Sequence, residues 1–128
     1  KAEDLLSNTM FPDAIAMGGY PIDIHSPDGE SMKHMKLKPG SWYSIPYRCL
    51  VTDQISNLIV AGRCISATHE ACAAIRVTPI VMAIGQAAGT AAAQSVRTGQ
   101  DANNLDVSLL RQKLIEDGVF LDEYKPLS

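Results

Sequence analysis

The feature that most constrains the fold of this chain is a long apolar run near its middle. It reads PIVMAIGQAAGTAAA from Pro79 to Ala93, and only Gln86 and Thr90 in it are clearly polar. The run is near the short limit for a membrane span, and its many Ala and Gly residues favour insertion only weakly. We therefore expect a buried helix in a soluble α/β core rather than a membrane span.

Both ends of this helix carry recognisable signals. Thr78 is predicted as the N-cap, with Pro79 at the first helical position, where its missing N–H costs nothing. The helix is expected to continue to about Arg97 and to stop at Gly99. Gly85 and Gly89 stand four residues apart among alanines, so one helix face has almost no side-chain bulk. That smooth face predicts close packing against another backbone.

The other segments predict further elements of an α/β fold. A short helix or arm is expected within residues 1–13, and a second, amphipathic helix is expected from an N-cap at Asp106 to Gly118. Residues 22–25 alternate apolar with polar, and residues 42–52 form a β-prone stretch interrupted at Pro46. Residues 58–62 (LIVAG) are wholly apolar, which is typical of a strand buried on both faces of a parallel sheet.

Composition narrows the class of partner. The chain has 128 residues and a formal net charge of −3, with 46% hydrophobic residues. No basic stripe is present that could neutralise a phosphate backbone, so we expect no nucleic-acid partner. The length suits a single domain with a core. Nothing in the composition marks a linker or repeat.

Three cysteines are present, Cys49, Cys64 and Cys72. An odd number without a CxxC pair argues against a disulfide scaffold or a zinc ribbon. Cys64, His69 and Cys72 could be considered as metal ligands, but their spacing is unusual and a fourth ligand would have to come from elsewhere. We expect unreactive thiols and no metal, a pattern that fits a cytoplasmic setting without establishing it.

Residues 57–93 are the most informative for function. A strand predicted to end at Gly62 is followed by a loop and then by the helix that begins near Pro79. Ligands bind at such strand ends, and the free N–H groups of a helix N-terminus favour an anion. The polar residues of the loop are Arg63, Ser66, Thr68, His69 and Arg76. They predict an anionic or electron-accepting ligand, and the alternative is a structural loop with solvated arginines.

Several ordered motifs resemble one known family. The run NLIVAGRCISATHEACAAIRVTPIVMAIGQAAGTAAA, preceded by YSIPYRCL, is similar to the C-terminal segment of the FAD-dependent oxidoreductases, two-domain flavoproteins of the glutathione-reductase-like class. Some relatives in that family are labelled xanthan lyases. The resemblance covers about residues 18–121. It implies an α/β fold that, as an isolated piece, is α+β: a few strands, a long Ala/Gly-rich helix and a C-terminal amphipathic helix of an incomplete Rossmann-like domain.

The resemblance implies specific cofactor contacts. Gly62 and Arg63 correspond to the pair near the FAD pyrophosphate and ribityl chain, and Ser66 lies in the same loop. Arg76, Val77 and Pro79 correspond to the run that brings the helix N-terminus to the flavin ring. Such a terminus would favour the negative charge of reduced flavin. The parent enzyme is expected to transfer a hydride from an unknown substrate to FAD.

One family feature is missing from this sequence. No G-x-G-x-x-G fingerprint follows a strand, and no acidic residue is placed to hold the adenosine ribose. We expect residues 1–52 to be a remnant of the substrate domain with connecting strands, and residues 53–128 to be the C-terminal part of the FAD-binding domain. The partner would be the N-terminal FAD-binding portion, or a second copy bound through the Ala/Gly-rich helix. Alone, the chain is expected to be inactive and to retain no FAD.

Two histidines are candidates for chemistry. His69 lies in the loop before the long helix, on the presumed flavin side, where acid–base work or substrate anchoring is an alternative to loop packing. His25 shares a strand face with Asp23 and is a candidate for substrate contact.

Two other functions stay open at this stage. The chain could be a non-catalytic α/β interaction module that uses its alanine-rich helix, or part of a protein of the xanthan lyase label. The lyase hypothesis would use Tyr43, Tyr47, His25 and Arg48 as its catalytic residues, although aromatic residues near a strand more often belong to the core.

Overall fold

The computed structural model describes residues 1–24, 33–35 and 37–121. That part of the chain forms a mixed α/β fold, as the sequence predicted. The helices and strands are α1 (Ala2–Leu6), β1 (Ala14–Gly18), β2 (Ile22–Ile24), β3 (Lys33–Met35), β4 (Tyr43–Pro46), α2 (His69–Ile75), α3 (Thr78–Thr98) and α4 (Val107–Glu116). Three 3-10 turns connect them, η1 (Tyr47–Cys49), η2 (Gly62–Cys64) and η3 (Ala102–Asn104).

The strands form two antiparallel pairs. β1 pairs with β4, with Gly18 opposite Tyr43 and an irregularity between Ala14 and Ala16. β2 pairs with β3, with Ile22 opposite Met35. The sequence pattern did not predict β1, because its residues are almost all buried and so lack the alternation of a half-exposed strand.

A side-chain contact explains the glycine at the end of β1. A Cβ on Gly18 would lie 2.5 Å from Cε2 of Tyr43 and 2.9 Å from Cδ1 of Ile80. The Tyr43 ring therefore occupies the space that a side chain at position 18 would need. Its hydroxyl donates to the carbonyl oxygen of Tyr20 (3.2 Å).

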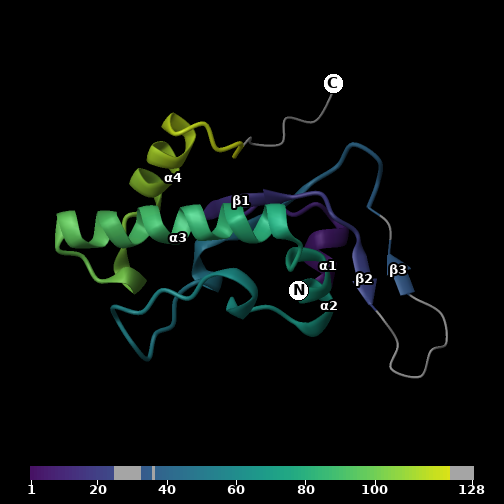
Figure 1. Ribbon diagram of the computed structural model, residues 1–128, viewed down its shortest axis with the longest axis horizontal. Helices are drawn as coiled ribbons and strands as arrows, with labels where there is room; N and C mark the ends of the chain where they lie inside the picture. Colours follow the sequence, from purple (N-terminus) through teal and green to yellow (C-terminus); the bar gives the residue numbers. More distant parts are fainter. Residues whose placement is uncertain (25–32, 36, 122–128) are drawn as a thin grey trace.

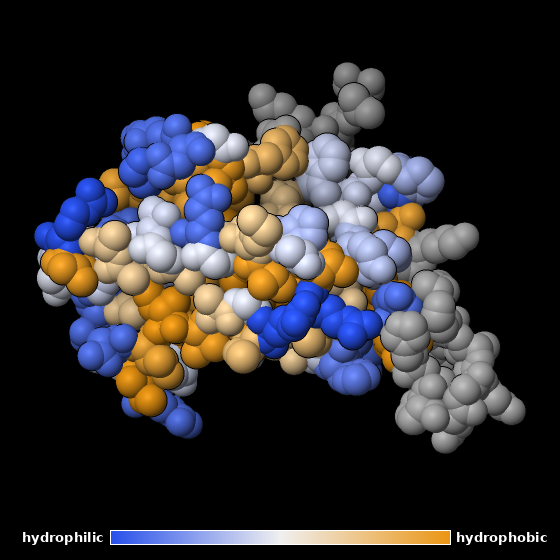
Figure 2. All heavy atoms as spheres, in the orientation of Figure 1, coloured by the Kyte–Doolittle hydropathy of each residue, from blue (hydrophilic) through white to orange (hydrophobic). Residues whose placement is uncertain are grey.

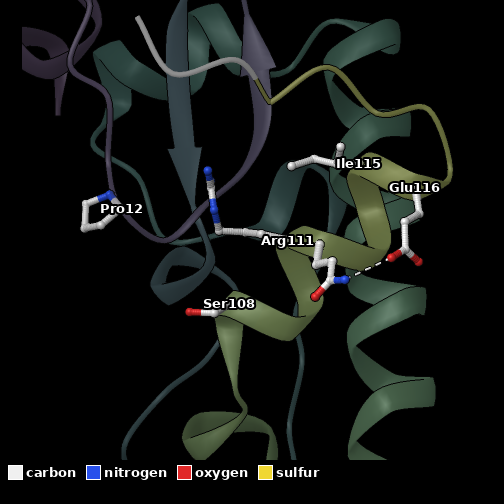
Figure 3. A pocket seen from close by; sticks show the side chains of 6 residues that line it. Pro12, Ser108, Arg111, Ile115 and Glu116 are labelled. Atoms are coloured by element: carbon white, nitrogen blue, oxygen red, sulfur yellow. Dashed lines mark hydrogen bonds between the residues drawn. The ribbon is translucent and has the colours of Figure 1, made fainter.

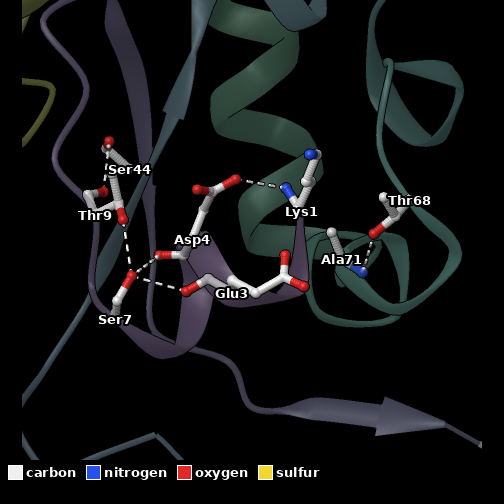
Figure 4. Close-up of polar contacts among 8 residues, drawn as sticks. All are labelled: Lys1, Glu3, Asp4, Ser7, Thr9, Ser44, Thr68 and Ala71. Atoms are coloured by element: carbon white, nitrogen blue, oxygen red, sulfur yellow. Dashed lines mark hydrogen bonds and ion pairs between the residues drawn. The ribbon is translucent and has the colours of Figure 1, made fainter.

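The segment before β1 is fastened to β4 through a serine. Oγ of Ser44 donates to the carbonyl oxygen of Thr9 (3.0 Å) and accepts from the N–H of Phe11 (2.8 Å). Figure 4 shows Ser44 beside Thr9 at the end of α1. These hydrogen bonds satisfy the backbone groups of Thr9 and Phe11, which lie between α1 and β1 and so belong to neither a helix nor a strand.

Helix α3 is the central element, and it packs against both β1 and α4, which also contact each other (Figure 1). Its buried positions follow the helical repeat and are Ile80, Ile84, Ala87, Ala88, Ala91 and Gln94. Gln94 satisfies its buried amide by donating from Nε2 to the carbonyl oxygen of Asp106 (2.8 Å). The helix ends as predicted, at Gly99 in the left-handed conformation (φ 67°).

The opposite side of α3 is open. No atom outside the helix lies within 4 Å of the Cβ positions of Gly85 and Gly89, so the predicted close packing against another backbone does not occur among the described residues. The side chains of Met82 and Val96 are 68% and 84% exposed. Figure 2 shows apolar residues gathered along α3 between hydrophilic flanks. Within the described ranges no single helix could span a membrane, and α2 with α3 passes that test only as a pair bent by 95°.

The prediction of Thr78 as N-cap of the long helix was wrong. Val77 is the N-cap, and Thr78 is already helical. Only Arg76 and Val77 separate α2 from α3, and the chain turns by 95° between the two helices, so α3 starts one residue earlier. Thr68 instead caps α2, where its Oγ1 accepts from the N–H of Ala71 (3.4 Å).

The prediction of a doubly buried strand at residues 58–62 was also wrong. The segment is irregular, the side chain of Leu58 is 39% exposed, and Gly62 opens η2. One backbone bond fastens it, from the N–H of Val60 to the carbonyl oxygen of Leu50 (2.7 Å). A strand forms only beside another strand, and the described residues place none next to this segment.

Candidate functional site

The corner between η2, α2 and α3 brings together the predicted arginines. Arg63 extends from η2 and donates from Nε to the carbonyl oxygen of Arg76 (3.1 Å), the residue that caps the C-terminus of α2. An open groove of about 510 Å³ lies beside them, lined by Tyr20, Arg63, Arg76, Val77 and Thr78. Residues from three separate segments therefore line one groove, and two of these segments each contribute an arginine.

The first turn of α3 opens into the same groove. Its N-cap, Val77, has no side-chain hydrogen bond to the helix, and the first turn contains no acidic residue. Pro79 has no N–H, whereas the N–H groups of Thr78 and Ile80 belong to the turn that has no carbonyl partners within the helix. The positive end of the helix dipole and the two arginines together suit an anionic group.

Gly62 is placed next to this helix end. Its φ of +73° lies in the left-handed region that favours glycine, and a Cβ there would be 3.8 Å from Cγ1 of Val81. Backbone conformation, and not lack of space, therefore makes glycine preferable at this position.

Two other predicted cofactor residues, Ser66 and Pro79, are not among the residues that line the groove. Ser66 is exposed, and its N–H donates to the carbonyl oxygen of Cys49 (2.8 Å), which fastens the loop. Pro79 is exposed in the first turn of α3. The groove contains two residues that the sequence reasoning had not placed there, Tyr20 and Thr78. Tyr20 lies between β1 and β2, and no local sequence signal places it beside the start of α3.

A second, smaller pocket adjoins this corner. Its volume is about 240 Å³, and its lining residues are Asp23, Ile24, His69, Cys72, Ala73 and Arg76. β2 supplies the first two, and α2 with its C-cap supplies the others. Arg76 lines both cavities, so they adjoin at this residue.

A family model supplies the context for this geometry. The model for FAD dependent oxidoreductases matches residues 1–114. This chain belongs to the FAD-dependent oxidoreductase family. Comparison with proteins of curated function and with solved structures finds no significant match. Family membership supports FAD as the cofactor of the parent enzyme.

A third cavity lies away from the residues that the family resemblance selects. Its volume is about 490 Å³, and it lies between Pro12 and α4 (Figure 3). Arg111 uses its guanidinium there to donate from Nη1 to the carbonyl oxygen of Ala14 (2.5 Å), and Gln112 donates to Glu116 (3.1 Å). The polar side chains of this cavity thus form hydrogen bonds between α4 and β1 and within α4.

The tyrosines of the IPYR region belong to the core. Tyr43 and Tyr47 are buried, and the hydroxyl of Tyr47 donates to the carbonyl oxygen of Ala102 (2.8 Å). Burial raises the pKa of both phenols above the ordinary range. Arg48 pairs with Asp13 and covers the ring of Phe11, with its Cζ 4.4 Å from the ring centroid. These side chains do not line the corner.

The other candidate residues are His25 and the three cysteines. His25 lies outside the described residues, so its pairing with Asp23 stays a prediction. The cysteines are free thiols, and burial raises the pKa of Cys49. Within the described ranges, no group of three or more His, Cys, Asp or Glu residues could hold a metal ion.

Proposed function

We propose that this chain is the C-terminal part of an FAD-dependent oxidoreductase and that its corner groove forms one wall of the flavin site. The observation that supports this most directly is the bond from Arg63 to the carbonyl oxygen of Arg76, beside the uncapped start of α3. It orients a guanidinium toward a helix N-terminus, in a chain whose family uses FAD. Gly62, Ser66, Val77 and Pro79 would complete this wall.

The donor set fits one portion of FAD. Guanidinium N–H groups, the Thr78 hydroxyl and helix N–H groups can bind phosphate or the electron-rich edge of the ring. No G-x-G-x-x-G sequence is present for the adenosine diphosphate half. We therefore assign that half to an N-terminal portion, with residues 1–52 from the substrate domain and 53–128 from the FAD-binding domain.

The residues of the corner have separate roles in this proposal. When bound, FAD supplies a hydride acceptor for the parent's substrate. The start of α3 and Arg76 stabilise negative charge at the acceptor edge. His69, in the adjoining pocket, would hold or move a proton of the substrate. His25, which lies outside the described residues, would contact the substrate.

The test compares this chain with a version extended at its N-terminus. We expect the extended protein to be purified yellow and the 128-residue chain to be purified without FAD. Arg76→Ala in the extended protein is expected to weaken FAD retention, whereas Arg97→Ala, which removes an exposed arginine from the last turn of α3, is not. A colourless extended protein would refute the proposal.

A second candidate function is a non-catalytic interaction module. The open face of α3 favours it, because exposed Met82 and Val96 flank two glycines on which none of the described residues packs. Its occupant would be either the N-terminal portion or a second copy of the chain. Sedimentation of the 128-residue chain over a concentration series would reveal the second copy. The lyase reading gains no support, since Tyr43 and Tyr47 are buried.

A further inference from the structure

The pocket between β2 and α2 has features of a ligand site in its own right. Asp23 on β2 contributes a carboxylate, and Arg76 at the end of α2 contributes a guanidinium. Ile24 and Ala73 are the apolar members of the same lining. A lining that combines opposite charges from two elements with apolar residues would orient a ligand that has its own polar ends.

Each charged wall selects a chemical group. A guanidinium binds a carboxylate through two parallel N–H bonds. Asp23 interacts with other groups of the protein, but a carboxylate has about four acceptor positions, so it can also accept from a ligand donor. His69, at the start of α2, offers an imidazole beside the same space. The preferred ligand therefore has a carboxylate at one end and an N–H or O–H donor close to it.

The size of the pocket limits the ligand further. Its volume of about 240 Å³ is below the range of roughly 300–1,000 Å³ usual for sites of drug-sized molecules. A molecule of few heavy atoms with a short apolar group against Ile24 and Ala73 would fill it. Long chains and sugars would extend into solvent.

We propose that this pocket binds a small organic acid whose carboxylate adjoins an amino or hydroxyl group, a 2-amino acid or a 2-hydroxy acid. Its role as the substrate site rests on the proposed flavoprotein function. Arg76 lines both this pocket and the groove at the start of α3. A carboxylate held by Arg76 places the adjacent carbon, which carries the hydrogen to be removed, at the border with the flavin groove.

The test is a titration of the isotope-labelled 128-residue chain followed by amide NMR shifts. Probes are L-lactate and L-alanine, with propionate lacking the donor and methyl lactate lacking the carboxylate. We expect saturable shifts centred on His69, Cys72 and Arg76 for lactate or alanine, with at least tenfold weaker binding of propionate and of methyl lactate. Equal binding of propionate, or no saturable shift with either acid, would overturn the proposal.

Variants locate the binding and separate the two acid classes. Arg76→Ala is expected to weaken binding at least tenfold, and Arg97→Ala is the matched control that leaves it unchanged. The near-isosteric Asp23→Asn should weaken binding of alanine more than that of lactate if an amine is recognised, and both alike if a hydroxyl suffices. Binding unaffected by both pocket variants would refute the assignment.

This experiment contains no flavin, so its outcome is independent of the proposed function. Acid binding to the chain, together with a colourless extended protein, would refute the flavin wall and retain the pocket. A yellow extended protein without acid binding would retain the flavin wall and refute the substrate class.

Discussion

At the residue scale, the structure of this chain depends on a few positions where one atom more or less changes the packing. Gly18 and Tyr43 face each other across the β1–β4 pair, and the aromatic ring fills the space that a side chain at Gly18 would occupy. A hydrogen bond from Nε of Arg63 to the carbonyl oxygen of Arg76 positions the guanidinium of Arg63. Neither contact could be read from sequence spacing, because the partners lie in different segments.

Gly18→Ala is expected to lower the free energy of unfolding by about 1–3 kcal/mol, the usual cost of overpacking. The new Cβ would clash with the Tyr43 ring and with Ile80. Gly19→Ala is the matched control, because its Cβ would be 3.6 Å from the carbonyl oxygen of Ser41, an ordinary contact. Urea unfolding of both variants measures the difference, and equal midpoints would contradict the packing argument.

The buried phenols predict a loss of stability in alkaline solution. Burial raises the pKa of Tyr43 and Tyr47 in the folded chain, whereas the unfolded chain loses these protons near pH 10. The two protonated phenols therefore make their full contribution to the free energy of unfolding below about pH 10, and this contribution declines as the pH rises further. Urea unfolding between about pH 8 and pH 11 should show this decline, and Tyr47→Phe should reduce its slope. An unchanged slope would argue against burial of Tyr47.

At the element scale, local signals and neighbouring elements decided different helix ends. The C-terminus of α3 and the N-cap of α4 were predicted correctly, since Gly99 and Asp106 act through their own backbone and side chain. The start of α3 was not, because the turn from α2 leaves only Arg76 and Val77 between the helices. A helix cap can thus be predicted from local sequence when no other helix ends directly beside it.

Asp106→Ala is expected to destabilise the chain by about 1 kcal/mol, since Oδ1 of Asp106 accepts from the N–H groups of Ser108 and Leu109. Asp101→Ala provides the control, because Asp101 precedes η3 without a side-chain bond to it. Thermal unfolding of the two variants would show the difference. Similar melting temperatures would mean that the cap contributes nothing.

At the scale of the whole molecule, the most informative feature is the open face of α3. One side of the helix packs on β1 and α4, while the side with Gly85 and Gly89 meets nothing among the described residues. Segment 58–62 has the composition of an interior strand, yet Leu58 and Ala61 in it are exposed. Both observations agree with the proposal that further chain covers this side in the parent enzyme.

Gly85→Ala and Gly89→Ala are expected to stabilise the 128-residue chain by about 0.5–1 kcal/mol each, because alanine restricts the unfolded helix segment and the space is open. In the N-terminally extended protein the same changes should destabilise, since a backbone packed on this face would meet the new methyl groups. Chemical unfolding of both lengths tests the change of sign. Stabilisation at both lengths would argue that the face stays open.

The candidate site shows the same division between local and distant information. Arg63, Arg76, Val77 and Pro79 were assigned to the flavin site from the family resemblance, and the structure places Arg63, Arg76 and Val77 in one groove. Tyr20 and Asp23 reach that corner only because β1 and β2 fold back against α2 and α3. Contacts across such separations depend on the fold, so no local pattern indicated them.

The amino-acid sequence was sufficient to predict the family, the α/β class, the course and C-terminal end of α3, and the capped start of α4. These depend on motifs, helical periodicity and caps, which act over a few residues. Contacts between distant segments were needed to show that β1 is a strand, that residues 58–62 are not, and that Arg76 lines two cavities. A strand needs a partner to satisfy its backbone, and a pocket needs walls from several segments, so both depend on how distant parts of the chain meet.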